Sequence, residues 1–426
     1  MRIVVCTLGT SGDHNPYMAV ALELARLGHH VECIVHPSYA SAAAKLRAAS
    51  EDAQATPLTV HAAGTEYPED YVLAHPELLH PRNAFYEIMR QLLLPDAVLQ
   101  FREIERLNAE REIDAVVAHH IAFGPIWWAE SRGVPLTLGW LAPISIMVPD
   151  GRGSMMPGFT WRTPLPLARA LRRAIPWLIR RELDAPMNAT RAALGLPPQR
   201  DAMVRLPGTS HGHVALWDDA LRSPVAGDPP GLVTCGFPFL PSAGGAQLPD
   251  EVMGFLTDEP APIACALGTT GGPIPLPIAD LVAEACELAG RRALLIGDRA
   301  PANARGSRWL PFAPHAPVFE RVPLVVHHGG MGTLAAVLRA GKPSMVLPLA
   351  NDQFDNGVRL RGRGVAAVLD PRKATPRAIA REIRKLLDDT DAARAAALIG
   401  ERVRASNGAR RAAEAIQAWR RRSVGR

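Results

Sequence analysis

The chain has 426 residues and a net charge of +5 at pH 7, with 48% hydrophobic and 21% charged residues. That length exceeds what one hydrophobic core usually organises, so we expect two domains, and the composition excludes a largely disordered protein. The mild excess of positive charge would favour an anionic ligand or an anionic membrane surface, but a soluble protein with Arg-rich helices explains it better, and we expect no nucleic-acid partner.

Cysteine usage and hydropathy predict a cytoplasmic protein. The five cysteines are scattered, and no two have CxxC spacing, so we expect reduced core thiols rather than disulfides or a zinc site. The N-terminus has a strand pattern rather than a basic leader, and no apolar run approaches the roughly 20 residues of a membrane span. We expect any membrane contact to be peripheral, at the inner membrane face.

The start of the chain predicts a strand, a turn, a helix and a second strand, over residues 2–8, 9–16, 18–27 and 30–35. The turn lacks the GxGxxG fingerprint and no acidic residue closes the second strand, so a nicotinamide dehydrogenase is disfavoured. Asp13 lies in this turn, where a carboxylate serves either as a helix N-cap or as a general base. His14 is a rival base, because imidazole titrates nearer to neutral pH.

The middle of the chain is less regular. A strand over residues 113–118 leads into His119, and residues 140–198 mix prolines, methionines and tryptophans with a basic helical run over 168–181. This run is either a solvated helix face or a contact for an acidic lipid head group, through Arg172, Arg173, Arg180 and Arg181.

The second half begins after residues 241–249, a linker candidate rich in Pro, Gly and small residues. A strand over 262–267 is followed by GTTGG, which contains Thr269 and Thr270 and is weak evidence for phosphate binding by itself. Later helices are expected over 376–387 and 392–419. A DTD sequence begins at Asp389, but it falls between these helices, where capping explains it, so we expect no metal site.

The most informative stretch covers residues 325–356. A strand breaks into HHGGMGT, and a helical pattern follows until GKP stops it. Backbone N–H groups and the positive end of the helix dipole can then face an anion, because glycine lets a phosphate approach the main chain. The next strand, over 344–349, ends in Asn351, Asp352 and Gln353, where parallel strands meet ligand. The stretch predicts a diphosphate site beside hydroxyl-binding side chains.

HHGGMGT, GKP and DQFDN, in this order, resemble the donor-binding signature of family 1 glycosyltransferases of the GT-B fold, and the likeness extends from end to end. Within the family the chain is similar to the rhamnosyltransferases of rhamnolipid synthesis. The resemblance implies an α/β fold with two Rossmann-like, doubly wound domains facing a cleft. The implied division is an acceptor-binding domain, a linker, a nucleotide-sugar-binding domain and a helix that braces the first domain, over 1–240, 241–250, 251–405 and 406–426.

The resemblance gives catalytic roles to Asp13 and His119. Asp13 fills the slot of the family's base, whereas many members carry Asp at the position of His119, so the two residue types look exchanged. His119 either pairs with Asp13 or is a satisfied histidine at a strand end. Phe312 corresponds to an aromatic residue that stacks on the nucleobase, with a core phenylalanine as the alternative. The implied donor-binding residues are Thr10, Thr269, Thr270, Phe312, His315, His327, Gly329, Gly330, Gly332, Thr333, Asp352 and Gln353.

The implied activity is an inverting, metal-independent transfer of a hexose, rhamnose or glucose. The donor is a nucleotide-diphosphate sugar, and the acceptor is a hydroxyl of a lipophilic small molecule or lipid, bound by residues 140–198. Many uridine-using relatives carry Glu where this chain has Ala335, which favours a dTDP-sugar over a UDP-sugar. The alternatives are a GT-B nucleotide-sugar epimerase, which needs several carboxylates around the sugar, and a non-catalytic GT-B helper, which lacks the base.

Overall fold

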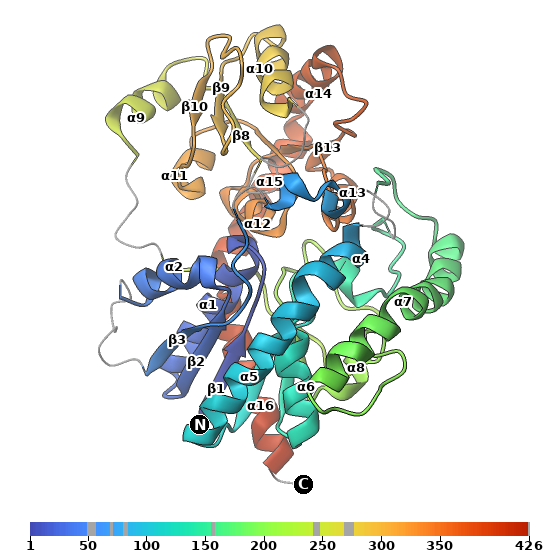
Figure 1. Ribbon diagram of the computed structural model, residues 1–426. Coiled ribbons are helices and arrows are strands. Elements are labelled where there is room, and N and C mark those ends of the chain that lie inside the picture. Colours follow the sequence, from blue (N-terminus) through green and yellow to red (C-terminus); the bar gives the residue numbers. More distant parts are fainter. Residues whose placement is uncertain are drawn as a thin grey trace.

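The computed structural model describes residues 1–48, 57–68, 71–79, 84–154, 158–241, 248–267 and 277–424. Within these residues the chain forms two parallel sheets, as expected for two Rossmann-like domains, and Figure 1 shows one sheet in each half of the molecule. Residues 242–247 of the expected linker lie outside the described residues. All five cysteine thiols are buried, and none forms a disulfide.

The first sheet has the order β3-β2-β1-β4-β5-β6-β7. Its strands are β1 (Arg2–Cys6), β2 (His30–Val35), β3 (Leu58–Ala62), β4 (Ala115–His119), β5 (Leu136–Trp140), β6 (Gly212–Ala215) and β7 (Val233–Thr234). Alternate residues of β1 point to opposite faces, and both faces are apolar, as expected for a buried parallel strand. Ile3 and Val5 pack in the core on one face of the sheet, whereas Val4 and Cys6 pack in the core on the other face.

Helices cover both faces of this sheet. The longer ones are α1 (Ser11–Arg26), α2 (Pro37–Ala48), α5 (Leu94–Glu110), α6 (Phe123–Arg132) and α7 (Leu165–Ala193). The short ones are α3 (Tyr71–Ala74), η1 (Pro76–Leu79), α4 (Ala84–Ile88), η2 (Met89–Leu93), η3 (Pro143–Ile146) and α8 (Leu206–Thr209). The helix α7 is longer than the basic run that predicted it, and it continues through Pro176 and Pro186. Packing of Leu183 and Met187 against the core outweighs the helix-breaking tendency of proline.

The second sheet has the order β10-β9-β8-β11-β12-β13. Its strands are β8 (Ile263–Ala266), β9 (Ala293–Ile296), β10 (Arg308–Leu310), β11 (Val325–His327), β12 (Ser344–Val346) and β13 (Ala366–Val368). The helices of this half are α9 (Asp250–Thr257), α10 (Ile278–Leu288), α11 (His315–Phe319), α12 (Met331–Ala340), α13 (Gln353–Gly362), α14 (Pro376–Asp388) and α15 (Thr390–Ala405). Asp389 caps α15 by accepting a hydrogen bond from the N–H of Ala392 at 2.8 Å, as the capping interpretation of the DTD sequence expected.

The single helix expected over 392–419 is wrong, because the chain breaks after α15 and begins again as α16 (Gly408–Val424). Ser406 is extended between the two, and the backbone at Gly408 lies so close to Gly236 that an added Cβ would be 2.5 Å from the Gly236 oxygen. The break redirects α16 to the first half of the molecule, where it packs beside α1 (Figure 1). No helix of the described residues is both long and apolar enough to cross a membrane.

Candidate active site

The order of each sheet changes direction once, between β1 and β4 and between β8 and β11. Ligands of doubly wound sheets bind at the carboxyl ends of strands at such a point. The helices α1 and α12 follow β1 and β11, and their first turns meet at the junction of the two halves. A Cβ atom added to Gly332 would lie 3.9 Å from the Cα of Gly12. The fold therefore brings the expected catalytic turn close to the expected phosphate turn.

Asp13 lies in the first turn of α1, and its two carboxylate oxygens have different neighbours. Oδ2 accepts hydrogen bonds from the backbone N–H of Thr10 at 2.9 Å and from Oγ1 of Thr10 at 3.2 Å. Oδ1 lies 3.9 Å from Nε2 of His119. Burial raises the pKa of the Asp13 carboxyl, and the hydrogen bonds from Thr10 oppose the shift. Asp13 is thus a capping residue whose second oxygen stays beside His119.

His119 ends β4 and is a neutral imidazole. Its Nδ1 accepts a hydrogen bond from the N–H of Ile121 at 3.3 Å, so the proton of the neutral ring lies on Nε2, which faces Asp13. Burial, with the neighbouring rings of His120 and His14, holds the pKa of His119 well below its usual value. The separation of 3.9 Å between Nε2 and Oδ1 is too long for a hydrogen bond, so the two groups are neighbours rather than a bonded pair.

His14, the rival candidate for the base, is buried beside another aromatic ring. Its side chain is fully buried, and the ring stacks on Tyr39 with 4.4 Å between the ring centroids. Burial and the nearby His36 lower the pKa of His14 to about 3. An acceptor cannot reach a ring in this position.

His327 ends β11 at the glycine turn, and its side chain is fully buried. The N–H of Gly329 donates to Nδ1 at 3.1 Å, so the proton of the neutral ring lies on Nε2, which has no hydrogen-bond partner. Burial, with His328 and His315, lowers the pKa of His327 to about 3. A buried N–H without an acceptor calls for an explanation, and an anionic ligand at the turn would supply one.

The glycine turn is tightly packed behind the first turn of α12. Gly329 has a φ of +93°, and a Cβ atom there would lie 2.9 Å from Cγ1 of Val346, so only glycine fits. Gly330 precedes α12 as its N-cap, and Gly332 and Thr333 belong to its first turn. The free N–H groups of this turn are the groups that bind anions at helix starts.

Asp352 and Gln353 begin α13, which follows β12. Gln353 accepts backbone hydrogen bonds from Leu349 and Ala350 with Oε1, at 2.7 and 3.1 Å, so its amide nitrogen is the end that can face a ligand. Asp352 accepts a hydrogen bond from Asn356 at 2.8 Å. Burial raises the pKa of Asp352 to about 7 against that bond, and the charge of Asp13 adds to the rise. The environment of Asp352 thus includes a charge from the other half of the chain.

The remaining expected donor-binding residues include Phe312, His315, Thr269 and Thr270. Phe312 is 78% exposed, so the alternative of a core phenylalanine is wrong. His315 stacks on Phe319 with 4.7 Å between centroids, and burial lowers its pKa to about 4. Thr269 and Thr270 lie outside the described residues. Among the residues that are described, no group of three or more His, Cys, Asp or Glu side chains could hold a metal ion.

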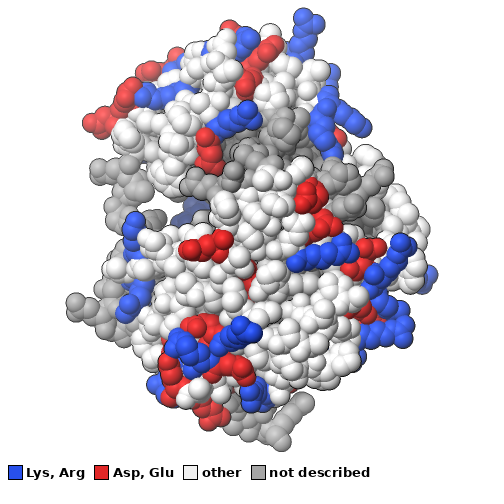
Figure 2. All heavy atoms as spheres, in the orientation of Figure 1, with Lys and Arg blue, Asp and Glu red and all other residues white. Residues whose placement is uncertain are grey.

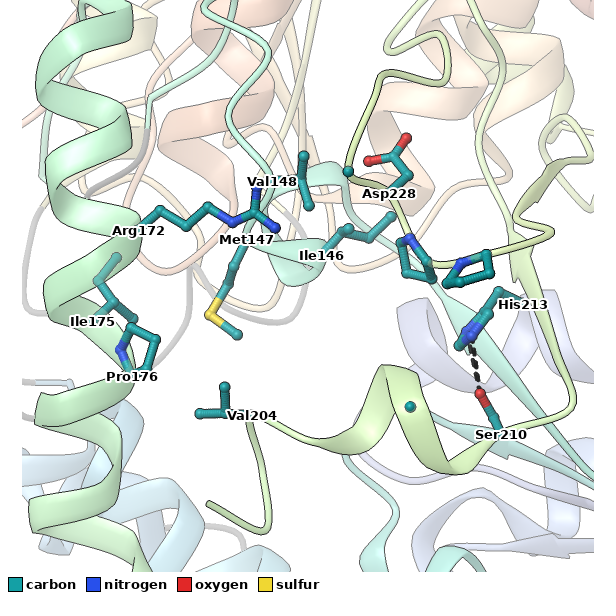
Figure 3. A pocket seen from close by; sticks show the side chains of 14 residues that line it. Ile146, Met147, Val148, Arg172, Ile175, Pro176, Val204, Ser210, His213 and Asp228 are labelled. Carbon is teal, nitrogen blue, oxygen red and sulfur yellow. Dashed lines mark hydrogen bonds between the residues drawn. The ribbon is translucent and has the colours of Figure 1, made fainter.

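A pocket of about 460 Å³ opens in the first half of the chain. Figure 3 shows its mostly apolar wall, with Arg172 of α7 on one side and His213 of β6 on the other. His213 approaches Ser210 at 3.0 Å and accepts a hydrogen bond from the indole N–H of Trp140 at 3.3 Å. Trp140 stacks on His120, which stacks on His119, so a row of rings joins the pocket to the candidate site. One wall of the pocket comes from the region 140–198, which was expected to bind the acceptor, and the rest comes from residues 204–230.

A chain of buried charges near this pocket was not predicted. Asp228 pairs with Arg222 at 2.5 Å, Arg222 with Asp150 at 3.8 Å, and Arg359 with both Asp150 and Asp355, at 2.5 and 2.7 Å. The chain runs from the pocket wall to α13, the helix that begins beside Asp352. Asp150 and Arg359 are 209 residues apart, so no local spacing could have revealed their contact.

A family model described as "Erythromycin biosynthesis protein CIII-like, C-terminal domain" matches residues 288–416. Among curated proteins, the chain is 30% identical over 380 residues to an uncharacterized glycosyltransferase of Mycobacterium tuberculosis, and the match covers 83% of each chain. It is 29% identical over 446 residues to the O-mycaminosyltylonolide 6-deoxyallosyltransferase of Streptomyces fradiae, covering 98% of this chain and 97% of that protein.

Solved structures show the same fold. The glycotransferase of kitacinnamycin superposes with a TM-score of 0.74 at 19% identity, covering 98% of both chains. The glycosyltransferase VinC, solved in complex with dTDP, superposes with a TM-score of 0.67 at 20% identity, covering 99% of this chain and 100% of that one.

Proposed function

Because the chain belongs to the family 1 glycosyltransferases of the GT-B fold, we propose that it transfers a hexose from a nucleotide-diphosphate sugar to a hydroxyl of a lipophilic acceptor. One observation carries the proposal. The first turn of α1, which holds Asp13, meets the first turn of α12, which would hold the donor, with 3.9 Å between the Cα of Gly12 and a Cβ atom added to Gly332. An acceptor activated by the first would meet a sugar held by the second.

In this mechanism Asp13 is the general base. Oδ2 stays hydrogen-bonded to Thr10, which fixes the carboxylate, and Oδ1 takes the proton from the acceptor hydroxyl. Burial raises the pKa of Asp13, so the carboxylate is a stronger base than an exposed aspartate. The neutral ring of His119 lies 3.9 Å from the same oxygen, and a closer approach in the complex with substrates would let its N–H orient the carboxylate. The acceptor oxygen attacks the anomeric carbon from the face opposite the diphosphate, with inversion.

The diphosphate leaves from the glycine turn. As the bond to the sugar breaks, its oxygen gains charge, and the unpaired Nε2–H of His327 with the N–H groups at the start of α12 stabilises it. These fixed donors would stabilise the leaving diphosphate without the help of a metal ion. Phe312, which is exposed, would stack on the base of the nucleotide, and Asp352 and Gln353 would bind sugar hydroxyls.

We propose a dTDP-linked 6-deoxyhexose such as rhamnose as the preferred donor, with glucose as the alternative sugar. Ala335 is buried on α12 where many uridine-using relatives carry Glu, so a ribose 2′-hydroxyl would lack that partner. The relative from Streptomyces fradiae is named as a 6-deoxyallosyltransferase, which supports a 6-deoxy sugar. VinC was solved with dTDP, which supports a dTDP-linked donor. Competition between thymidine- and uridine-linked sugars in one assay tests the proposal, and a clear preference for the uridine donor would overturn it.

The base is tested by Asp13→Asn in a sugar-transfer assay. The amide keeps an oxygen that can accept from Thr10, so the cap survives while the base is lost. We expect kcat to fall about 10²- to 10⁴-fold while the affinity for nucleotide diphosphate stays unchanged. Activity near that of the parent protein would eliminate Asp13 as the base.

A further inference from the structure

The first half of α7 is rich in positive charge, of which Arg180 and Arg181 are paired with Asp201 and Glu182. Residues 165–181 contain five arginines and neither Asp nor Glu. Arg169, Arg172 and Arg173 are exposed, and none of them makes an ion pair with a described carboxylate. Figure 2 shows blue side chains on the flank where Figure 1 draws α7. Concentrated charge of one sign on one helix calls for a partner of the opposite sign.

The same segment exposes large apolar side chains. Of the ten large apolar side chains that are exposed among the described residues, four lie between residues 161 and 178: Trp161, Leu167, Trp177 and Leu178. Leu167, Ala170, Ala174, Trp177 and Leu178 recur at three- and four-residue spacing, so they form one stripe along the helix. Trp177 is 56% exposed near the C-terminal end of this stripe.

The opposite side of the segment is anchored to the protein. Ala168 and Ile179 are buried, so the helix is held in place with its apolar stripe outward. Arg169 and Arg173 lie beside the stripe, where their long side chains can extend toward charged groups while Trp177 and Leu178 enter an apolar layer. An apolar stripe flanked by arginines and tryptophan is the pattern of helices that lie in the surface of an anionic bilayer.

We propose that the outer face of α7, formed by Leu167, Arg169, Arg173, Trp177 and Leu178, binds an anionic lipid bilayer. Arg172, Ile175 and Pro176, on the other side of the same helix, line the pocket shown in Figure 3, so this binding brings the pocket to within one helix diameter, about 10 Å, of the bilayer. If the proposed function holds, a lipophilic acceptor then enters the pocket from the lipid. The binding itself is independent of catalysis and is measured without it.

The test is co-sedimentation of the full chain with vesicles of phosphatidylcholine, alone or mixed with phosphatidylglycerol. We expect binding to the mixed vesicles, weakened by salt, and little binding to the neutral ones. Replacing Arg169 and Arg173 by Ser should lower the affinity about fivefold for each arginine. Trp177→Ser with Leu178→Ser should lower the affinity as well, because these two side chains would no longer insert into the apolar layer of the bilayer.

The matched control removes two exposed cations elsewhere, by Lys373→Ser with Arg377→Ser, and should bind like the parent. Thermal unfolding by circular dichroism confirms that each variant is folded. Equal binding to both vesicle types, no binding to either, or unchanged binding of both α7 variants would overturn the proposal. Sedimentation without vesicles would also overturn it, because it would show that the stripe contacts a second copy of the chain.

Discussion

The two carboxylate oxygens of Asp13 face different groups, and this difference lets one residue serve both local structure and the proposed chemistry. Oδ2 completes the capping of α1 through Thr10, whereas Oδ1 is the oxygen beside His119. The capping and base interpretations of Asp13 are therefore compatible rather than exclusive. A carboxylate that is fixed by its own helix start needs little reorganisation when an acceptor arrives.

Asp352 should make stability depend on pH. Its pKa is about 7 in the folded chain against an ordinary value of 3.8. The folded chain therefore holds this proton more tightly, so the contribution to stability is complete below the ordinary pKa and is lost as the pH rises through about 7. Asp352→Asn cannot ionise. We expect it to exceed the parent in unfolding free energy by at least about 1 kcal/mol at pH 8, measured by denaturant titration, and by less at pH 5. An equal gap at both pH values would contradict this prediction.

His327→Ala should weaken binding of a nucleotide diphosphate and slow transfer together, because the same N–H would contact the phosphates before and during reaction. Loss of one hydrogen bond to a charged group corresponds to a decrease in affinity of about 10- to 100-fold, which calorimetric titration can measure. His14→Ala is a matched control, since it removes another fully buried histidine from a different place. Unchanged affinity in His327→Ala would mean that the glycine turn has only a structural role.

At the scale of elements, the buried charges connect α13 to the segment that follows η3. Asp355 accepts a hydrogen bond from the backbone N–H of Ser154 at 2.8 Å, and Arg359 reaches Asp150 in the same segment. Arg359 holds the pKa of Asp150 below its usual value. Such a chain of paired charges is stable only while it is complete, because each removed partner leaves an uncompensated charge in a region that excludes water.

Arg359→Leu should therefore destabilise the protein by about 3–5 kcal/mol, because it leaves the buried carboxylates of Asp150 and Asp355 without this positive partner. The midpoint of urea unfolding measures this loss. Arg394→Ser breaks a pair with Asp391 in which both side chains are exposed, and it should cost about 1 kcal/mol or less. Similar losses in the two variants would show that the buried chain contributes no more than surface pairs.

At the scale of the whole molecule, α16 joins the C-terminus to the first domain. Ala412, Ala413 and Ile416 lie in the core beneath α1, and Trp419 packs so closely on Gly212 that a Cβ there would be 2.2 Å from its ring. We propose the domain division as 1–240 and 251–405, joined by a linker over 241–250, with residues 406–426 belonging structurally to the first domain.

Ile416→Ala should cost about 2–5 kcal/mol, because it opens a cavity at the contact of α16 with α1. Hydrogen exchange should then speed up in α1 and β1, and not in β8 to β13. Leu398→Ala on α15 is the matched control, since Leu398 is 60% exposed and its truncation should change stability by about 0.5 kcal/mol or less. Faster exchange in the second sheet instead would contradict the proposed division.

The sequence alone determined those features that depend on neighbours in the chain. The apolar runs predicted the parallel strands, and HHGGMGT with DQFDN predicted the glycine turn before α12 and the polar residues that follow β12, because strand period, glycine conformation and helix starts are local properties. The same patterns wrongly predicted one helix over 392–419. The chain breaks after α15, where Gly408 closely approaches Gly236, a residue that is distant in the sequence.

The tertiary structure decided which residues from distant parts of the sequence lie close together. His14 and His119 were both candidates beside Asp13, and only the order of β1 and β4 brings His119 to the carboxylate while His14 is buried against Tyr39. The approach of Gly12 to Gly332 and the contact of Asp150 with Arg359 likewise depend on how two sheets dock. Contacts between such distant residues depend on the free energy of the whole packed molecule, and no local pattern encodes that.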